Sequence, residues 1–108
     1  MSEQDPIVIV GSARTAMGGM QGDFAAVTAP QLGATAIEAA LQRAGINGDD
    51  VDEVIMGNVR GAGQGQAPAR QASKGAGIPD AVGATTINKM CGSGMKAAMF
   101  GHDLLVAG

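Results

Sequence analysis

The chain has 108 residues, a length that fits one modest domain, and 45% of them are hydrophobic, which is enough apolar material for a buried core. Seven Lys and Arg against ten Asp and Glu give a net charge of −3, and the only aromatic residues are two phenylalanines. Without a basic surface or aromatic rings for base stacking, the composition argues against nucleic-acid binding. One Cys and one His exclude an internal disulfide framework and disfavour a metal site.

The start of the chain and its cysteine content predict a cytoplasmic protein. Residues 1–6 are polar and acidic and precede only four apolar residues, which differs from the charged start and longer apolar run of a secretory signal. No apolar run approaches the ~20 residues of a membrane helix. We therefore expect an intracellular protein of a reducing compartment that does not enter a membrane.

The first predicted element is a strand at 7–10, four apolar residues without polar alternation between a proline and a glycine. Such a run is typical of a parallel strand covered on both faces. Residues 11–29 show no steady period and are predicted to form a long loop. A helix is predicted over 28–44, because a threonine opens it as a cap, a proline fits its first turn and a glycine follows it.

The alternation continues after a turn at 46–50. A strand is predicted at 54–56, and a helix is predicted to open with Pro68 and run to about Ala76. A third strand is predicted at 84–89. A third helix is predicted from Gly92, with an apolar face that comprises Met95, Ala98, Met99, His102, Leu105 and Val106.

Strands that alternate with helices predict an α/β fold with a parallel βαβαβα order and right-handed crossovers. Three strands make a thin sheet, and an all-apolar first strand is poorly suited to an exposed edge. We therefore expect these residues to form part of a larger domain.

Cys91 is the candidate functional residue, because it lies between a predicted strand and a predicted helix. Unpaired N–H groups and the positive end of the helix dipole favour the thiolate there. Gly92 and Gly94 leave space beside the sulfur, where a carbonyl compound would approach and its oxyanion would meet backbone donors. The alternative is that Cys91 is a small buried apolar residue, as many free cysteines are.

Other chemical motifs fail at stated positions. The glycines lack the spacing of a dinucleotide fingerprint or a P-loop, and Ser93 lacks the flanking glycines of a hydrolase nucleophile. His102 lies about 16 Å from Cys91 along one predicted helix, at 1.5 Å per residue, which is too far for it to serve as the base. We expect His102 to be packed and hydrogen-bonded. Arg14 would follow the first strand and meet an anion there, although a solvated or ion-paired arginine is the simpler expectation.

Several other polar and sulfur-containing residues have a structural interpretation first. Gln64, Arg70 and Gln71 would order a loop or a subunit contact, although such residues usually cap and solvate a helix start. Methionines mostly fill gaps in a core, and Met90 and Met95, which flank the thiol, would also line an acyl pocket.

The segment 88–97 is similar to the nucleophile motif of the thiolases. Residues 14–18 resemble the loop after the first strand of that family, and 57–72 resemble its second-strand loop and the helix that follows. Ala67 is a departure, since an asparagine is usual there in acetyl-CoA acetyltransferases, and the pair at 60–61 is also atypical of that loop.

The resemblance implies that residues 1–108 are the N-terminal portion of a thiolase N-terminal domain, the start of a larger mixed five-stranded sheet with helices on both faces. It implies acetyl transfer between acetyl-CoA and a second acyl-CoA, as a Claisen condensation to acetoacetyl-CoA or the reverse thiolysis, through acyl-Cys91. Coenzyme A thioesters would be substrates, with no cofactor. The remainder of a thiolase chain would supply the acid and base, so this chain alone is expected to be inactive, and a homodimer or homotetramer is the implied assembly.

Two alternatives stay open at the level of sequence. One is a non-catalytic α/β module for subunit association, in which Cys91 is merely packed at a strand–helix junction. The other is a decarboxylating condensing enzyme of the same fold, which starts from a similar cysteine.

Overall fold

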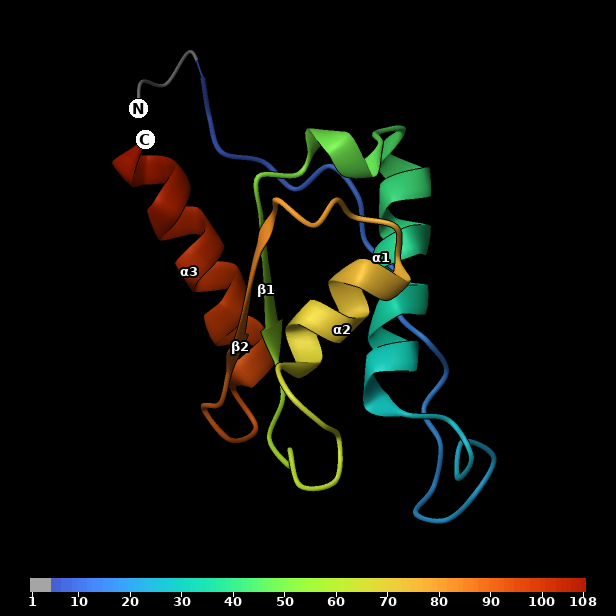
Figure 1. Cartoon of the computed structure of the whole chain (residues 1–108). Helices are drawn as coiled ribbons and strands as arrows, with labels where there is room; N and C mark the ends of the chain where they lie inside the picture. Colours follow the sequence, from blue (N-terminus) through green and yellow to red (C-terminus); the bar gives the residue numbers. More distant parts are fainter. Residues whose placement is uncertain (1–4) are drawn as a thin grey trace.

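The computed structural model describes residues 5–108. In this part of the chain, three α-helices and two strands alternate, with a short 3₁₀ turn at Gly48–Asp50 (Figure 1). The elements are α1 (Ala29–Ala44), β1 (Glu53–Gly57), α2 (Pro68–Gly75), β2 (Gly83–Ile87) and α3 (Ser93–Ala107).

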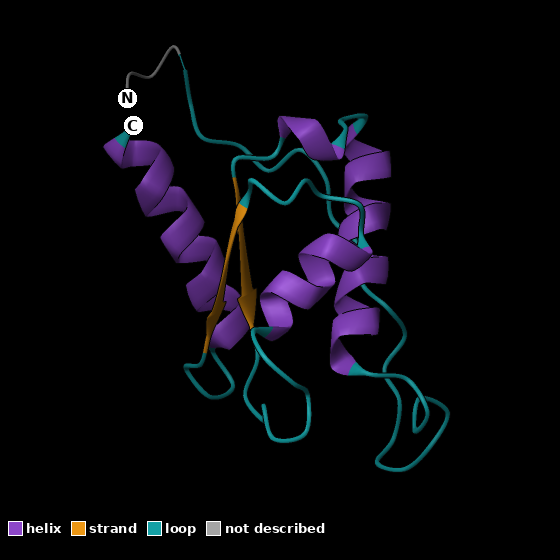
Figure 2. Ribbon diagram, viewed as in Figure 1, coloured by secondary structure: helices purple, strands orange, loops and turns teal. Residues whose placement is uncertain are grey.

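The two strands form a parallel sheet with helices on both faces. The pairing runs from Glu53 opposite Gly83 to Gly57 opposite Ile87. Figure 2 shows α3 on one side of the strands and α2 on the other, with α1 packed against α2. The predicted α/β class and parallel direction are therefore confirmed, and the larger five-stranded sheet stays a prediction.

Helix α1 begins and ends where its sequence predicts. The Thr28 hydroxyl accepts the Gln31 N–H at 3.2 Å, and the Gln31 side chain accepts the Thr28 N–H at 2.8 Å. This reciprocal pair satisfies two N–H groups that the first turn leaves free. At the other end Gly45 adopts a left-handed φ of 70°, a conformation that costs glycine little.

Small residues bring α1 and α2 into close contact. A methyl group added at Gly33 would lie 3.0 Å from the Ala72 side chain, and one added at Gly75 would lie 3.0 Å from Ala34. Beside this contact, Val54, Ile78 and Val82 form the buried cluster, with Ile37 and Leu41 of α1 packed against it. The side of α1 that carries Ile37 and Leu41 therefore faces the core.

The predicted strand at 7–10 is wrong for the described part of the chain. Neither β1 nor β2 pairs with it, and three of its side chains are 64% to 90% exposed. The chain instead lies against α1, where an added methyl group at Gly11 would meet the Ala40 oxygen at 2.8 Å. Arg43 of α1 also donates to the Ser12 carbonyl at 2.8 Å. An apolar run forms a strand only where a neighbouring strand supplies hydrogen-bond partners.

The apolar face predicted for α3 is not the face that packs on the sheet. Its methionines, Leu105 and Val106 are 50% to 66% exposed within the described structure. Ser93 is buried, and Ala97 and Gly101, one and two turns further along the same side, are half-buried. Small side chains on this side let the helix backbone approach the strands. Hydrophobic spacing therefore identified an apolar face of α3, but not the face in contact.

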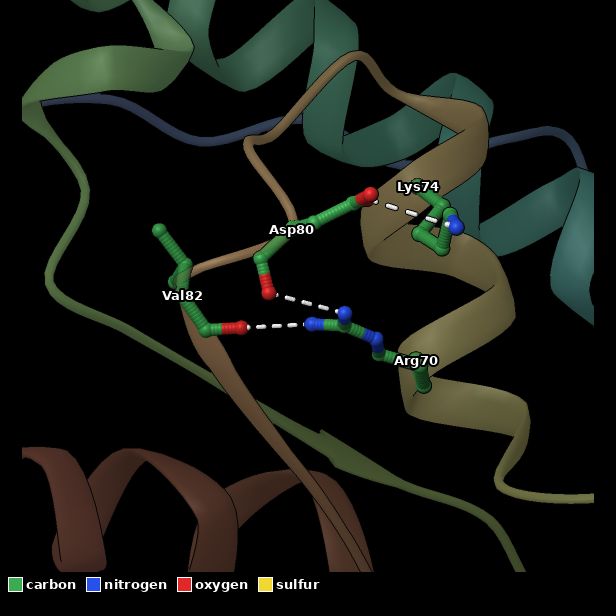
Figure 3. A network of polar contacts seen from close by, with 4 residues as sticks. All are labelled: Arg70, Lys74, Asp80 and Val82. Carbon is green, nitrogen blue, oxygen red and sulfur yellow. Dashed lines mark hydrogen bonds and ion pairs between the residues drawn. The ribbon is translucent and has the colours of Figure 1, made fainter.

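Arg70 of α2 joins the helix to the chain that enters β2 (Figure 3). Its guanidinium donates to the Val82 carbonyl at 2.7 Å and to the Asp80 carbonyl at 2.8 Å. The neighbouring ion pair between Lys74 and Asp80, at 3.3 Å, is largely exposed. Arg70 therefore orders the entry to β2 through two main-chain acceptors, so of the interpretations left open by the sequence the ordering of a loop describes it.

Arg70→Lys removes the planar fork that serves both carbonyls. We expect the free energy of unfolding to fall by about 1–2 kcal/mol, the value of one or two ordinary hydrogen bonds. Lys74→Ala, the matched change one turn away, loses only an exposed ion pair and should cost about 0.5 kcal/mol or less. Urea denaturation followed by circular dichroism measures both variants, and equal losses would contradict this role of Arg70.

Ala67 holds a backbone conformation that alanine rarely adopts. It is the N-cap of α2 with φ 48° and ψ 71°, and its side chain makes no cap hydrogen bond. A left-handed residue with a Cβ costs about 1–2 kcal/mol, and asparagine tolerates this region better than other non-glycine residues. The asparagine usual at this position in the family that the sequence resembles would therefore relieve strain that Ala67 retains.

Ala67→Asn and Ala67→Gly should each raise the free energy of unfolding by about 1 kcal/mol, through relief of the left-handed alanine. Ala76→Gly at the other end of α2, where φ is −87°, should bring no gain, because alanine is unstrained there. Thermal and urea unfolding compare the three variants. A gain for Ala76→Gly that matched the other two would point to a general effect of substitution.

Candidate active site

Cys91 lies in the turn between β2 and α3, directly before Gly92, the N-cap of α3. This turn follows the carboxyl end of β2, where both parallel strands end, at the lower end of the sheet in Figure 1. Such edges are where open α/β sheets bind ligands. The thiol is exposed within the described structure. Its predicted place at a strand–helix junction is confirmed, and the alternative of a buried cysteine does not describe it here.

The turn before the thiol has an unusual backbone that neighbouring side chains support. Met90 has a left-handed φ of 48°. Its N–H donates to the Asn88 side chain at 2.9 Å, and its carbonyl accepts the Ser93 hydroxyl at 2.6 Å. The Ser93 oxygen also accepts the Lys89 N–H at 2.9 Å. These bonds on both sides of Met90 fix the backbone that presents Cys91.

Asn88 and Ser93 are site residues whose role the sequence reasoning missed. Ser93 is buried, with 4% exposure, and its hydroxyl is fully engaged, so it supports the turn and is not a nucleophile. Asn88 ends the β2 ladder earlier than predicted, because its side chain bonds the main chain two residues on. An asparagine just after a strand is a known signal for this kind of turn, and it was available in the sequence.

The first turn of α3 offers free donors beside the thiol. Within residues 5–108, no carbonyl or side chain accepts the N–H of Gly94 or Met95, whereas the Lys96 N–H bonds the Gly92 carbonyl at 2.9 Å. A methyl group added at Gly94 would meet no atom within 4 Å outside its own helix turn. The helix start therefore has two unpaired N–H groups and an uncrowded glycine, and unpaired N–H groups are the donors that an oxyanion requires.

The last residue of β1 sets the distance between the sheet and this helix start. A methyl group added at Gly57 would lie 2.6 Å from the carbonyl carbon of Ser93 and 2.7 Å from the nitrogen of Gly94. Both atoms belong to the backbone of α3, so a larger residue would move the helix. Glycine at this position lets α3 begin directly against the strand.

Gly57→Ala should displace the start of α3 and lower the free energy of unfolding by about 2 kcal/mol or more, since the added methyl group meets backbone. Gly61→Ala is the matched control in the following loop, where the nearest atom to an added methyl group is 3.8 Å away. Urea denaturation gives the stabilities, and backbone amide shifts across 91–96 report the displacement. Unchanged shifts in Gly57→Ala would show that the close contact does not place the helix.

Two other predicted candidates stay apart from the thiol. His102 lies in the C-terminal half of α3 with its side chain 58% exposed, 3.3 Å from the Asp103 carboxylate. The expectation that His102 is packed is therefore wrong for the described structure, because no described residue covers that face of α3, whereas the expected hydrogen bond is present, to Asp103. Arg14 is exposed and donates to the carbonyl of the adjacent Thr15 at 3.0 Å, which agrees with a solvated arginine. Neither residue supplies a base to Cys91.

The remaining predicted residues have structural positions. Gln71 donates to the carbonyls of Gln64 and Gln66 at 2.9 and 2.7 Å, and the Gln64 side chain donates to the Arg60 carbonyl at 2.7 Å. Gln64 and Gln71 therefore order the loop before α2, which was one of the two interpretations left open by the sequence. Met90 and Met95 flank the thiol with 65% and 66% exposure. An acyl pocket between them stays a prediction.

Three further features bear on the kind of site. A shallow apolar groove of about 260 Å³ lies between α1, β1 and Val10, and its lining does not include the Cys91 turn. No three His, Cys, Asp or Glu side chains among residues 5–108 gather where they would hold a metal ion. No helix in this part of the chain has the length and apolar character to cross a membrane. The thiol and the helix start are therefore the chemically distinctive part of the described structure.

Comparison with known families agrees with this geometry. The sequence model of the family described as "Thiolase, N-terminal domain" matches residues 7–108. The chain belongs to the thiolase family. Two relatives of this thiolase chain are the acetyl-CoA acetyltransferase of Cupriavidus necator, 55% identical over 102 residues, and a cytosolic acetyl-CoA acetyltransferase of Gibberella zeae, 49% identical over 108.

These alignments cover 94% and 100% of this chain but 26% and 27% of the two relatives. The chain thus spans about a quarter of the length of the curated relatives it matches. Other acetyl-CoA acetyltransferases that match are named as mitochondrial proteins.

A solved thiolase has the same arrangement of elements. The crystal structure of Acat5 thiolase from Ascaris suum in complex with coenzyme A superposes with a TM-score of 0.90 at 34% identity, over 93% of this chain and 26% of that one. The parallel βαβα segment described above is therefore the start of a thiolase fold.

Proposed function

We propose that this protein is a thiolase that transfers an acetyl group between acetyl-CoA and a second acyl-CoA, with Cys91 as the nucleophile. The observation that carries the proposal is the exposed Cys91 thiol on a supported turn, next to the free N–H groups of α3. The names of the relatives, acetyl-CoA acetyltransferases, support the choice of substrate.

The Cys91 position suits acyl transfer in two steps. In the first, the thiolate attacks the thioester carbonyl, the new C–S bond forms, and the bond to the sulfur of coenzyme A breaks, so coenzyme A leaves as a thiolate that takes up a proton. In the second, the acyl group passes to the enolate carbon of another acetyl-CoA, which gives acetoacetyl-CoA, and Cys91 is released. Thiolysis is the same sequence in reverse. The free donors of the first turn of α3 would stabilise the oxyanion formed at each attack.

Proton transfer in this scheme needs groups outside residues 5–108. The one histidine lies in the far half of α3, and the described residues bring no other base to the thiol. We propose that residues 1–108 are the N-terminal portion of a thiolase N-terminal domain and that the remainder of a thiolase chain supplies these groups. The 108 residues alone would then not complete a turnover. A homodimer or homotetramer is part of the same proposal.

The relatives support the proposed substrate and location. The Ascaris suum thiolase was solved with coenzyme A, which supports coenzyme A thioesters as substrates here, with no additional cofactor proposed. A cytoplasmic location is proposed on the strength of the Gibberella zeae relative, which is named cytosolic. The reducing cytoplasm would keep the Cys91 thiol free.

The two alternatives from the sequence have less support. A module that only associates with other subunits gives no reason for an exposed thiol on a strained and supported turn. A decarboxylating condensing enzyme would share the cysteine and the fold, but the relatives described above are acetyl-CoA acetyltransferases.

Acetyl-CoA should place one acetyl group on Cys91 of the intact enzyme, with the remainder of the thiolase chain present, because a thioester is a good acyl donor to a thiolate. Intact-mass measurement after a short incubation shows the adduct, and neutral hydroxylamine should remove it if it is a thioester. Cys91→Ala should show no adduct under the same conditions. An adduct that persisted in Cys91→Ala would overturn the proposed nucleophile.

A further inference from the structure

The loop after β1 lies beside the Cys91 turn. Both segments leave the carboxyl ends of the paired strands, and Figure 1 shows them together at the same end of the sheet. The Asn58 N–H donates to the Ile87 carbonyl at 2.9 Å, which extends the strand pairing one residue beyond β1. The two loops therefore start from a fixed separation.

Asn88 connects these loops with one amide group. Its nitrogen donates to the Val59 carbonyl at 3.3 Å, while its oxygen accepts the Met90 N–H at 2.9 Å. The support of the left-handed Met90 therefore depends on where the Val59 carbonyl lies, as well as on the turn itself.

The loop is in turn closed by a glutamine and tied to α2. Asn58 donates to the Gln64 side chain at 2.6 Å, and the Gln64 amide donates to the Arg60 carbonyl at 2.7 Å. Gln71 of α2 donates to the Gln64 and Gln66 carbonyls at 2.9 and 2.7 Å. These hydrogen bonds, joined through the backbone of residues 58–60 and of Gln64, connect α2 to the turn that presents the thiol.

The backbone of this loop makes one internal hydrogen bond, from the Gln64 N–H to the Gly61 carbonyl at 3.1 Å, and is otherwise rich in glycine. Gly63 and Gly65 adopt left-handed φ values of 77° and 82°, and a third glycine stands at 61. Glycine-rich segments lose more conformational entropy on ordering than others. The side-chain bonds of Gln64 and Asn58 therefore hold the Val59 carbonyl in place.

We propose that Gln64 and Asn88 are positioning residues for Cys91. Gln64 fixes the loop between β1 and α2, and Asn88 conveys that arrangement to the Met90 turn, so the thiol is held by α2 as well as by β2. Neither side chain is placed against the sulfur. The consequence for acyl transfer rests on the proposed function, whereas the ordering of the turn does not.

A pair of substitutions at position 88 separates this proposal from a purely local role. Asn88→Asp keeps an oxygen that accepts the Met90 N–H and loses the donor to Val59. If the link between the loops matters, Asn88→Asp will change the rates of Met90 amide exchange and Cys91 acetylation as Asn88→Ala does. If the asparagine only caps its own turn, both rates in Asn88→Asp will equal those of the unmodified protein, which would overturn the proposal.

The remote end is tested with Gln64→Ala. Amide hydrogen exchange of Met90 in the intact protein should become about fivefold faster, the factor that corresponds to one ordinary hydrogen bond. Exchange within α1 should not change, which shows that the protein remains folded. Gln66→Ala is the matched control in the same loop, because its contribution to Gln71 is a main-chain carbonyl that alanine retains. Unchanged Met90 exchange in Gln64→Ala would overturn the proposal.

The rate of Cys91 acetylation by acetyl-CoA gives the second readout. Gln64→Ala and Asn88→Asp should slow it by about the same factor, at unchanged dependence on acetyl-CoA concentration, because the proposal gives neither residue a contact with the substrate. If the unmodified protein is not acetylated, the proposed function fails while Met90 exchange still decides the positioning role. If acetylation occurs and is unaffected by both variants, only the positioning role fails.

Discussion

The arrangement of this site depends on the contact between the end of β1 and the start of α3. At Gly57 the strand and the helix backbone are so close that a single methyl group would overlap Ser93 and Gly94. Because the helix begins at that contact, its free N–H groups lie at the carboxyl end of the sheet, and Cys91, two residues before the helix, lies on the surface. Small residues along α3 extend the same close packing.

A second constraint is the conformation of Met90. A left-handed residue with a long side chain is unfavourable by itself, so the turn persists only because other groups oppose its relaxation. Ser93 and Asn88 do so within the turn, and Asn88 also reaches the neighbouring loop. Stability and presentation of the thiol thus draw on the same few hydrogen bonds, which is common at sites where a backbone must be held in one orientation.

Local signals predicted the parts of the fold that local chemistry determines. The ends of α1 follow from Thr28 and Gly45, and the start of α2 follows from Pro68, because caps and prolines act within one turn. The place of Cys91 between a strand and a helix was predicted for the same reason.

The failures concern contacts between distant segments. The apolar run at 7–10 has the composition of a strand, but strand formation requires a partner that composition does not specify. His102 shares an apolar helix face, yet spacing does not reveal whether anything covers that face. The bond from Asn88 to Val59 joins residues 29 positions apart, so no local pattern announces it.

The contact of Arg70 with the chain before β2 constrains the amino acid at position 70 but not the amino acids that it binds. Its guanidinium binds the carbonyl oxygens of Asp80 and Val82, groups that every amino acid carries. A substitution at the exposed position 80 therefore leaves this attachment intact, whereas a substitution of Arg70 removes it. One residue of α2 restrains the entry to β2, and the restrained segment is comparatively free to diverge in sequence.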